Sequence, residues 1–222
     1  MYQDKTLLPR EVIRLAALGT LASRAMSYAE LANEVRHFVS RIASPSLDLM
    51  GTSIELLRYE GLVSPLDMSS IVEGTPLEIT DAGRAELHAL LCSAVRAPLN
   101  DVNKLVLALK IRFLHLLDGD DQRGQVEMMI EAGETELARL VDLRRHHEGS
   151  EGHLNEWLDH DIELVGRRHD WLRDFRARLD VAAAAPGAGA ELRRTRRGAR
   201  PRTAPSAAPS PGARGLDKPR RR

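Results

Sequence analysis

Histidine and carboxylate side chains, the common ligands of catalytic metals, gather between residues 146 and 170. They are His146-His147-Glu148, His153, His160-Asp161 and His169-Asp170, and His-Asp pairs are the ligands of one class of metal-dependent phosphohydrolases. His160 and His169 are nine residues apart, which places them about 180° apart around a helix. They cannot share a metal on one straight helix, and no His-x-x-x-His pair occurs. We therefore expect no metal site and no cofactor.

The remaining side chains also give no support for an enzyme. Cys92 is the single cysteine, so neither an internal disulfide nor a zinc-binding thiol cluster is expected. Its neighbours Leu90, Leu91 and Ala94 favour burial, and Arg96 is too distant along the chain to favour redox sensing. The sequence has no phosphate-binding Gly-rich loop and no Gly-x-Ser-x-Gly motif.

Basic residues, most of them arginines, are concentrated at the C-terminal end of the chain. Residues 181–222 contain 11 Lys and Arg against two acids, whereas the chain as a whole has 32 of each. This Ala/Pro/Gly-rich segment has almost no large apolar residue, so we expect a disordered tail on an acidic body. Its run RRTRRGARPR is a candidate electrostatic arm for DNA, and a solubilising tail that folds back on the body is the alternative. The six arginines are Arg193, Arg194, Arg196, Arg197, Arg200 and Arg202.

The body begins with a domain expected over residues 1–97, in the order helix, helix, helix, hairpin, helix. Pro9 begins the first helix, and Ser27 and Glu30 form a capping box for the second. A third helix runs to Gly61, and the runs LVSPLD and TPLEIT then predict a hairpin, followed by a helix capped by Thr80. This order predicts a winged helix-turn-helix, with a generic small helical domain as the alternative.

Residues 98–180 are expected to form a second, helical domain. Its last helix carries apolar residues and a histidine at nearly heptad spacing, which predicts a helix-helix contact. A homodimer interface and packing within the chain are both open. The expected interface residues are Leu158, Ile162, Val165, His169, Leu172 and Leu179. The predicted class is therefore mostly α with a small β-hairpin wing, a C-terminal helical dimerisation domain and a disordered tail.

Three stretches resemble the PadR family of bacterial transcription regulators, which is related to the MarR-like group. ELLRYEGLV at 55–63 is similar to the end of its third helix, and LEITDAGRAEL at 77–87 carries its Ile-Thr-x-x-Gly motif. WLRDFRARL at 171–179 resembles the end of its C-terminal helix. The resemblance implies a dimeric repressor of transcription that binds an inverted repeat in double-stranded DNA. A small-molecule effector could bind between the domains, with Trp157, Trp171, Met128 and Met129 as candidates.

The third helix and its neighbour carry the side chains expected to contact DNA. Phosphates provide affinity, and base edges provide sequence choice. The expected contacts are Arg36, Arg41, Ser44, Ser46, Thr52, Arg58 and Tyr59, with an ordinary solvated helix face as the alternative. No Lys or Arg occurs between Arg58 and Arg84, which opens a second hypothesis. In that alternative the acidic wing binds a protein partner and the tail binds nucleic acid non-specifically. Since no apolar run reaches the length of a signal peptide or membrane span, we expect a cytoplasmic protein without membrane contact.

Overall fold

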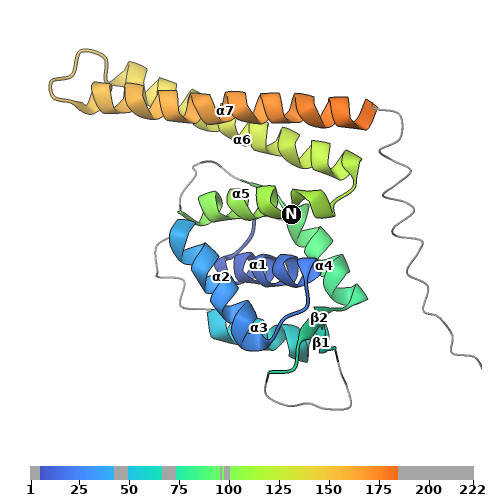
Figure 1. Ribbon diagram of the computed structural model, residues 1–222. Coiled ribbons are helices and arrows are strands. Elements are labelled where there is room, and N and C mark those ends of the chain that lie inside the picture. The colour runs from blue at the N-terminus through green and yellow to red at the C-terminus, as the bar shows by residue number, and fades with distance from the viewer. Residues whose placement is uncertain (1–5, 43–49, 67–73, 96, 98–100, 185–222) are drawn as a thin grey trace, which may run out of the picture. The chain divides into compact units, whose positions relative to one another are not determined.

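Seven α-helices and one two-stranded sheet make up the part of the chain described by the computed structural model, which covers residues 6–42, 50–66, 74–95, 97 and 101–184. Side chains are described there except at residues 50–53. In chain order the elements are α1 (Pro9–Ser23), α2 (Tyr28–Ile42), α3 (Met50–Tyr59), β1 (Val63–Pro65), β2 (Leu77–Ile79), α4 (Asp81–Leu91), α5 (Asp101–Phe113), the short 3-10 helix η1 (Leu114–Leu116), α6 (Gly119–His146) and α7 (Leu154–Ala184) (Figure 1). Within the described residues, no helix is long and apolar enough to cross a membrane.

The first part of this order is a winged helix-turn-helix. Strands β1 and β2 pair antiparallel, with Val63 opposite Ile79 and Pro65 opposite Leu77. Met26, just before α2, forms an antiparallel bridge with Leu77 of β2 through two backbone hydrogen bonds. This single residue adds to the two-stranded sheet. The predicted fold class of three helices, a hairpin and a fourth helix is confirmed.

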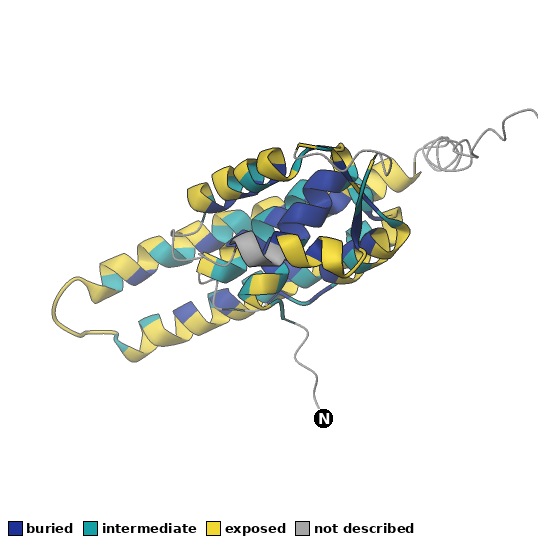
Figure 2. Ribbon diagram, turned by 90° about the horizontal axis from the view of Figure 1, so that it is seen from below, coloured by how far each residue is buried: buried dark blue, intermediate teal, exposed yellow. Residues whose placement is uncertain are grey.

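Helix α1 forms the centre of this domain because nearly its whole circumference is apolar. Its residues from Val12 to Leu21 are buried on every side except at Arg14, and Figure 2 shows the helix enclosed by more exposed elements. Helices α2, α3, α4 and α5 all pack against it. A helix with no polar face needs such all-round cover.

The predicted start of α2 and the predicted end of α3 are confirmed. The Ser27 hydroxyl accepts from the Glu30 backbone N–H at 3.3 Å, and the Glu30 carboxylate accepts from the Ser27 N–H at 2.8 Å. The Ser27 N–H and the Ser27 hydroxyl both donate to the Glu30 carboxylate and so lower the pKa of Glu30. The end of α3 is a Schellman motif, in which Leu62 N–H donates to the Leu57 carbonyl and Gly61 takes φ +71°. The capping residues thus fix where the chain enters α2 and where it leaves α3.

Helix α5 joins the winged domain to the C-terminal helices. The Phe113 ring packs so closely on Gly19 of α1 that a Cβ there would lie 2.5 Å from it. Arg112 lies over the Phe38 ring of α2 at 4.5 Å from its centroid and pairs with Glu34 at 3.0 Å. One hydrophobic core runs from Val12 through α5 to Ile130 of α6. The predicted domains therefore share a core, and the division after residue 97 stays a prediction.

A buried lysine connects α4, α5 and α6. The Lys110 ammonium is fully buried and donates to the carbonyls of Leu91 at 2.5 Å and Ser93 at 2.6 Å, and to Gln125 Oε1 at 2.8 Å. Burial lowers the pKa of Lys110 to about 8, and the nearby Cys92 acts in the opposite direction. Its three N–H groups are all used, and two of them satisfy backbone carbonyls at and just beyond the C-terminal end of α4.

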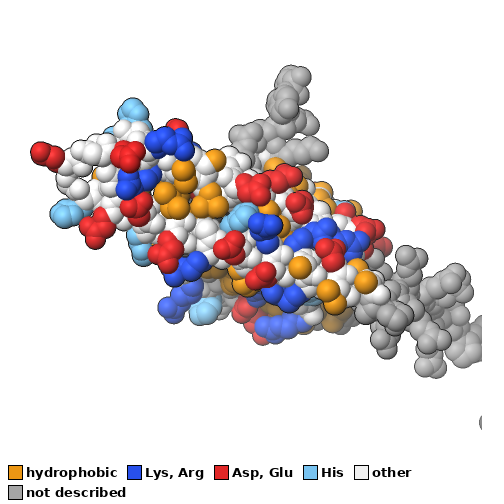
Figure 3. Space-filling model, turned by 90° about the horizontal axis from the view of Figure 1, so that it is seen from above, with side chains coloured by type: hydrophobic (Ala, Val, Ile, Leu, Met, Phe, Trp, Pro, Cys, Tyr) orange, Lys and Arg blue, Asp and Glu red, His pale blue; other side chains and the backbone are white. Residues whose placement is uncertain are grey.

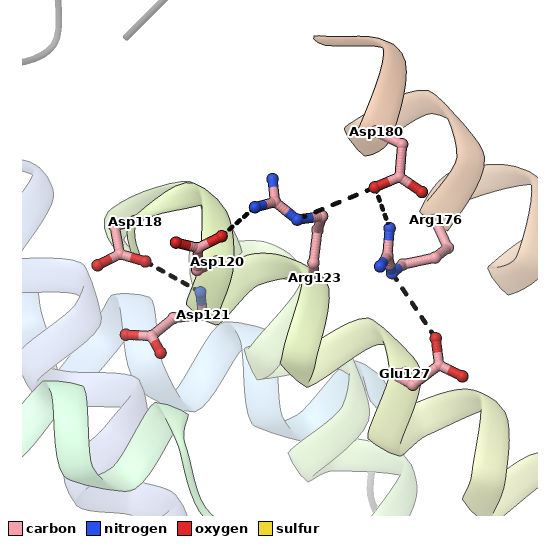
Figure 4. A network of polar contacts seen from close by, with 7 residues as sticks. All are labelled: Asp118, Asp120, Asp121, Arg123, Glu127, Arg176 and Asp180. Carbon is pink, nitrogen blue, oxygen red and sulfur yellow. Dashed lines mark hydrogen bonds and ion pairs between the residues drawn. The ribbon is translucent and has the colours of Figure 1, made fainter. Parts of the chain in front are cut away.

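Helices α6 and α7 lie side by side as an antiparallel hairpin (Figure 1). Leu140, Leu158 and Val165 form a small core of their own between the two helices. Near the other end of the hairpin, Arg123 and Arg176 form a charged network with Asp120, Glu127 and Asp180 (Figure 4). Helix α7 continues to Ala184, so the first four residues of the predicted tail are helical. The arginine run at 193–202 lies outside the described residues.

Candidate nucleic-acid interface

One face of α3 packs against the hydrophobic core, and the opposite face is exposed to solvent. Ile54 and Leu57 are buried in the core at 2% and 0% exposure. Behind its C-terminal end, the Thr80 hydroxyl donates to the Gly61 carbonyl at 2.8 Å and accepts from the Gly83 N–H at 3.1 Å. A Cβ at Gly83 would lie only 2.1 Å from the Leu62 carbonyl oxygen. The Ile-Thr-x-x-Gly stretch therefore packs α4 against the exit of α3.

The open side of α3 presents Glu55, Leu56, Arg58 and Tyr59. Tyr59 is 90% exposed and Leu56 is 48% exposed. The Arg58 side chain is exposed and forms no ion pair with any residue that the structure describes. A guanidinium and a phenol are thus available side by side at the end of the helix.

The second helix contributes two further exposed guanidinium groups, those of Arg36 and Arg41. Arg36 donates to the Asn33 side chain at 3.0 Å, and within the described part of the chain neither arginine is paired with an acid. Tyr28 is the first residue of α2, and charges on both α2 and α3 act on it: burial raises its pKa, Glu55 raises it further and Arg36 acts in the opposite direction. Arg36 and Glu55 are therefore close enough to influence the same phenol.

Several acids of the winged domain are engaged inside the protein. Glu60, which follows α3, receives two hydrogen bonds from Arg14 of α1. Glu34 pairs with Arg112 of α5, and Glu30 caps its own helix. Because these carboxylates are bonded to other groups of the protein, they neutralise less of the positive charge of the arginines on α2 and α3 than the sequence suggests. Glu55 and Glu78 stay exposed.

Some expected contacts fall outside what the structure describes. Ser44 and Ser46 lie in the segment 43–49, and the side chain of Thr52 is not described although its backbone is helical. The six tail arginines and the wing residues 67–73 also lie outside the described residues. Of the predicted DNA contacts, the structure places Arg36 and Arg41 on α2 and Arg58 and Tyr59 on α3, and these two helices pack against each other. Their role stays a prediction.

The stripe predicted for a dimer interface is placed within the chain. Leu158, Val165, His169 and Leu172 of α7 are buried, and Ile162 and Leu179 are partly buried. His169 packs over Gly133 of α6, with its Nε2 3.4 Å from Glu134 Oε1. Packing within the chain was the alternative left open by the sequence. A part for this stripe in a dimer stays a prediction.

Another face of α7 carries exposed apolar side chains that the sequence analysis did not single out as a stripe. Trp157, Leu164 and Trp171 are 57%, 44% and 46% exposed, and they are spaced seven residues apart. Phe175 stacks on Trp171, with 5.3 Å between ring centroids. Figure 3 shows hydrophobic side chains among charged ones on the outer side of the α6-α7 hairpin. The heptad spacing could have revealed this second stripe, but the aliphatic stripe beside it gave the stronger signal.

Comparison with known proteins bears on what these surfaces do. No curated protein matches the chain. Among solved structures, the chain is similar to Bacillus subtilis PadR in complex with operator DNA, at 17% sequence identity and a TM-score of 0.32. The match covers 76% of this chain and 97% of that chain. A family model described as "Putative AphA-like transcriptional regulator" matches residues 2–176. Since this match spans both the winged helix-turn-helix and the α6-α7 hairpin, the chain belongs to the AphA-like family of transcriptional regulators.

Proposed function

We propose that this protein is a DNA-binding regulator that acts, in the manner of PadR proteins, as a dimeric repressor at an inverted-repeat operator. The observation that carries the proposal is the exposed set Arg36, Arg41, Arg58 and Tyr59 on α2 and α3. Membership of a family of transcriptional regulators supports it. Such a regulator acts on DNA in the cytoplasm and needs no enzymatic chemistry.

In this proposal α3 enters the major groove, with Arg58 as its main polar contact. A guanidinium can form two hydrogen bonds to the O6 and N7 atoms of guanine, or neutralise a phosphate. Arg36 and Arg41, on the preceding helix, contact the phosphates beside the groove, as the first helix of such motifs does. Tyr59 can donate a hydrogen bond to a phosphate or pack on the sugar.

Two copies are joined through α7. The exposed stripe of Trp157, Leu164 and Trp171 has the seven-residue spacing of a two-stranded coiled coil. Aromatic side chains of this kind are enriched in protein interfaces. Because the residues predicted for the dimer are buried or partly buried within the chain, this second stripe is the better-placed contact in a preformed hairpin. The two winged domains then meet half-sites about one helical turn of DNA apart, or a multiple of it.

The arginine-rich tail adds affinity without adding sequence choice. Its cations neutralise phosphates near the operator, whereas α3 selects the sequence. This division of roles fits a recognition helix whose described part carries a single arginine, Arg58. An effector could modulate binding through the junction of α5, α6 and α7, where a small hollow is lined by Leu107, Met129 and His169.

Selection of binding sites from random duplexes tests the proposal, with the full chain and with a chain ending at Ala184. We expect both proteins to enrich the same palindromic motif, and we expect the shorter chain to bind this DNA with lower affinity. Binding by the full chain alone, without any enriched motif, would contradict sequence-specific regulation. That result would instead favour a winged domain that binds a protein partner, with a tail that holds nucleic acid non-specifically.

A further inference from the structure

Three potential metal ligands from two helices meet at the junction of α4 and α6. His88 and Cys92 are four residues apart on α4, and therefore lie on one face of the helix. Asp121 comes from the first turn of α6. Its Oδ2 is 2.8 Å from His88 Nε2, and Cys92 Sγ is 3.9 Å from His88 Nδ1. One donor atom from each residue lies within 4.8 Å of the other two.

The donor types define the class of ion. An imidazole nitrogen, a thiolate sulfur and a carboxylate oxygen together suit a borderline transition metal such as Zn²⁺, and not the oxygen-bound Mg²⁺ or Ca²⁺. Zinc accepts three protein ligands with water in the fourth position. His88 presents Nε2 to Asp121 and Nδ1 to Cys92, so a shared ion would bind one ring nitrogen, and the other ligand side chains would turn toward it. Binding would release the thiol proton to solvent.

The surroundings favour a cation over a free thiolate. The Cys92 thiol is half-buried, and the negative charges of Asp121 and Asp118 act on it. The ammonium of Lys110 is the opposing charge, but its three donors are directed at carbonyl and amide oxygens. The same two carboxylates that disfavour an isolated thiolate attract a divalent ion.

The Asp121 carboxylate is free of the charged network on α6 and α7. Figure 4 shows it turned away from Arg123, which instead contacts Asp120 and Asp180. The Asp118 carboxylate accepts the Asp121 backbone N–H at 2.9 Å and so fixes the turn that presents the ligand. The side chains of His88 and Asp121 are 56% and 38% exposed, so an ion can reach them from solvent.

We propose that His88, Cys92 and Asp121 form a binding site for a divalent transition metal of the Zn²⁺ class. The ion ties the last helix of the winged domain to the start of the C-terminal hairpin. This junction already contains Lys110, so the metal stiffens the connection through which the hairpin positions the winged domain. The site does not depend on which DNA the protein binds, or on whether it binds DNA.

Titration of the metal-free full chain with Zn²⁺ and with Co²⁺ tests the proposal. We expect one ion per chain by calorimetry, and a thiolate-to-Co²⁺ charge-transfer band by absorption spectroscopy. Cys92→Ser should abolish the band. His88→Gln and Asp121→Asn should each weaken binding by at least about tenfold, since loss of even an outer-shell partner costs this much.

His153→Gln is the matched control, because His153 also contacts a carboxylate, that of Glu156 at 3.3 Å, without a cysteine nearby. It should leave Zn²⁺ affinity and the Co²⁺ band unchanged. Stoichiometric binding that persists in both Cys92→Ser and His88→Gln would place the metal elsewhere and overturn the proposal. Failure of the unmodified chain to bind either metal, or a Co²⁺ spectrum without a thiolate band, would overturn it as well.

Discussion

Gly83→Ala should destabilise the protein strongly, because no room exists for one more carbon. The added Cβ would lie 2.1 Å from the Leu62 carbonyl oxygen and 2.8 Å from Ile79 Cγ1. An ordinary carbon-oxygen contact is about 3.3 Å, so the backbone of α4 must move by about 1 Å. The obstacle is backbone, which cannot rotate away as a flexible side chain would.

That movement also strains the hydrogen bonds that join α4 to the exit of α3. The Leu62 carbonyl accepts from the Thr80 N–H and from the Thr80 hydroxyl, both at 3.1 Å. Overpacking costs about 1–3 kcal/mol, and each weakened hydrogen bond costs up to about 1 kcal/mol. We therefore expect the free energy of unfolding to fall by about 2–4 kcal/mol. The urea midpoint, followed by circular dichroism, measures this loss.

Gly124→Ala is the matched control. Gly124 lies within α6, is exposed, and has no atom within 4 Å of its Cβ position. Because alanine is the better helix former, this change should stabilise the protein by about 0.5–1 kcal/mol. The two substitutions add the same methyl group and should shift the midpoint in opposite directions. A Gly83→Ala protein as stable as the parent would refute the close packing of α4 on Leu62.

Three further predictions concern Lys110, the tail and α7. Because the pKa of Lys110 is about 8 in the folded chain, that chain holds fewer protons than the unfolded chain from about pH 8 to 10.5, so stability should rise with pH there. Across this pH range the free energy of unfolding of the parent should rise by about 3 kcal/mol more than that of Lys110→Met, measured by denaturation. The same pH dependence of stability in both proteins would contradict this. Removing the tail after Ala184 should make the slope of log K against log salt less negative by about 4 to 5 in DNA-binding titrations, and equal slopes would exclude an electrostatic arm. Leu164→Glu should convert the proposed dimer to a monomer in sedimentation experiments while Glu163→Gln stays dimeric, and a dimeric mass for Leu164→Glu would exclude this face.

The sequence predicted the elements well where local chemistry decides them. Ser27, Thr80 and Gly61 act through neighbours within four residues or through the backbone itself, so their signals can be read directly. The hairpin was predicted from short extended runs around residues 63 and 78. These features depend on the order of residues and very little on tertiary packing.

The charge on the surface of α3 was harder to predict, because the ion pairs of its acidic neighbours depend on the tertiary fold. The sequence shows Glu60 beside Arg58, which suggests a recognition helix without net positive charge. In the structure Glu60 is held by Arg14, which lies 46 residues earlier. Nothing in the local sequence indicates this partner, so only the fold shows that Glu60 is paired with Arg14 and not with Arg58.

The candidate metal ligands were missed for a similar reason. The spacing of His88 and Cys92 is visible in the sequence, but a search for paired histidines passes over it. Asp121 lies 33 residues beyond His88 and approaches it only because α6 begins beside α4. The sequence contains many histidines near the C-terminal end of the body, but a metal site also requires that the ligands lie close together in the fold.

The central claim, that α3 reads DNA through Arg58, is tested most directly by operator affinity. Fluorescence anisotropy should compare Arg58→Ala with Arg173→Ala, which removes an exposed α7 arginine that forms no ion pair with described residues. On the selected operator, Arg58→Ala should weaken binding by about tenfold or more, as expected for loss of a guanidinium-base contact, whereas Arg173→Ala should bind like the parent. Equal operator affinity for the two variants would contradict the account.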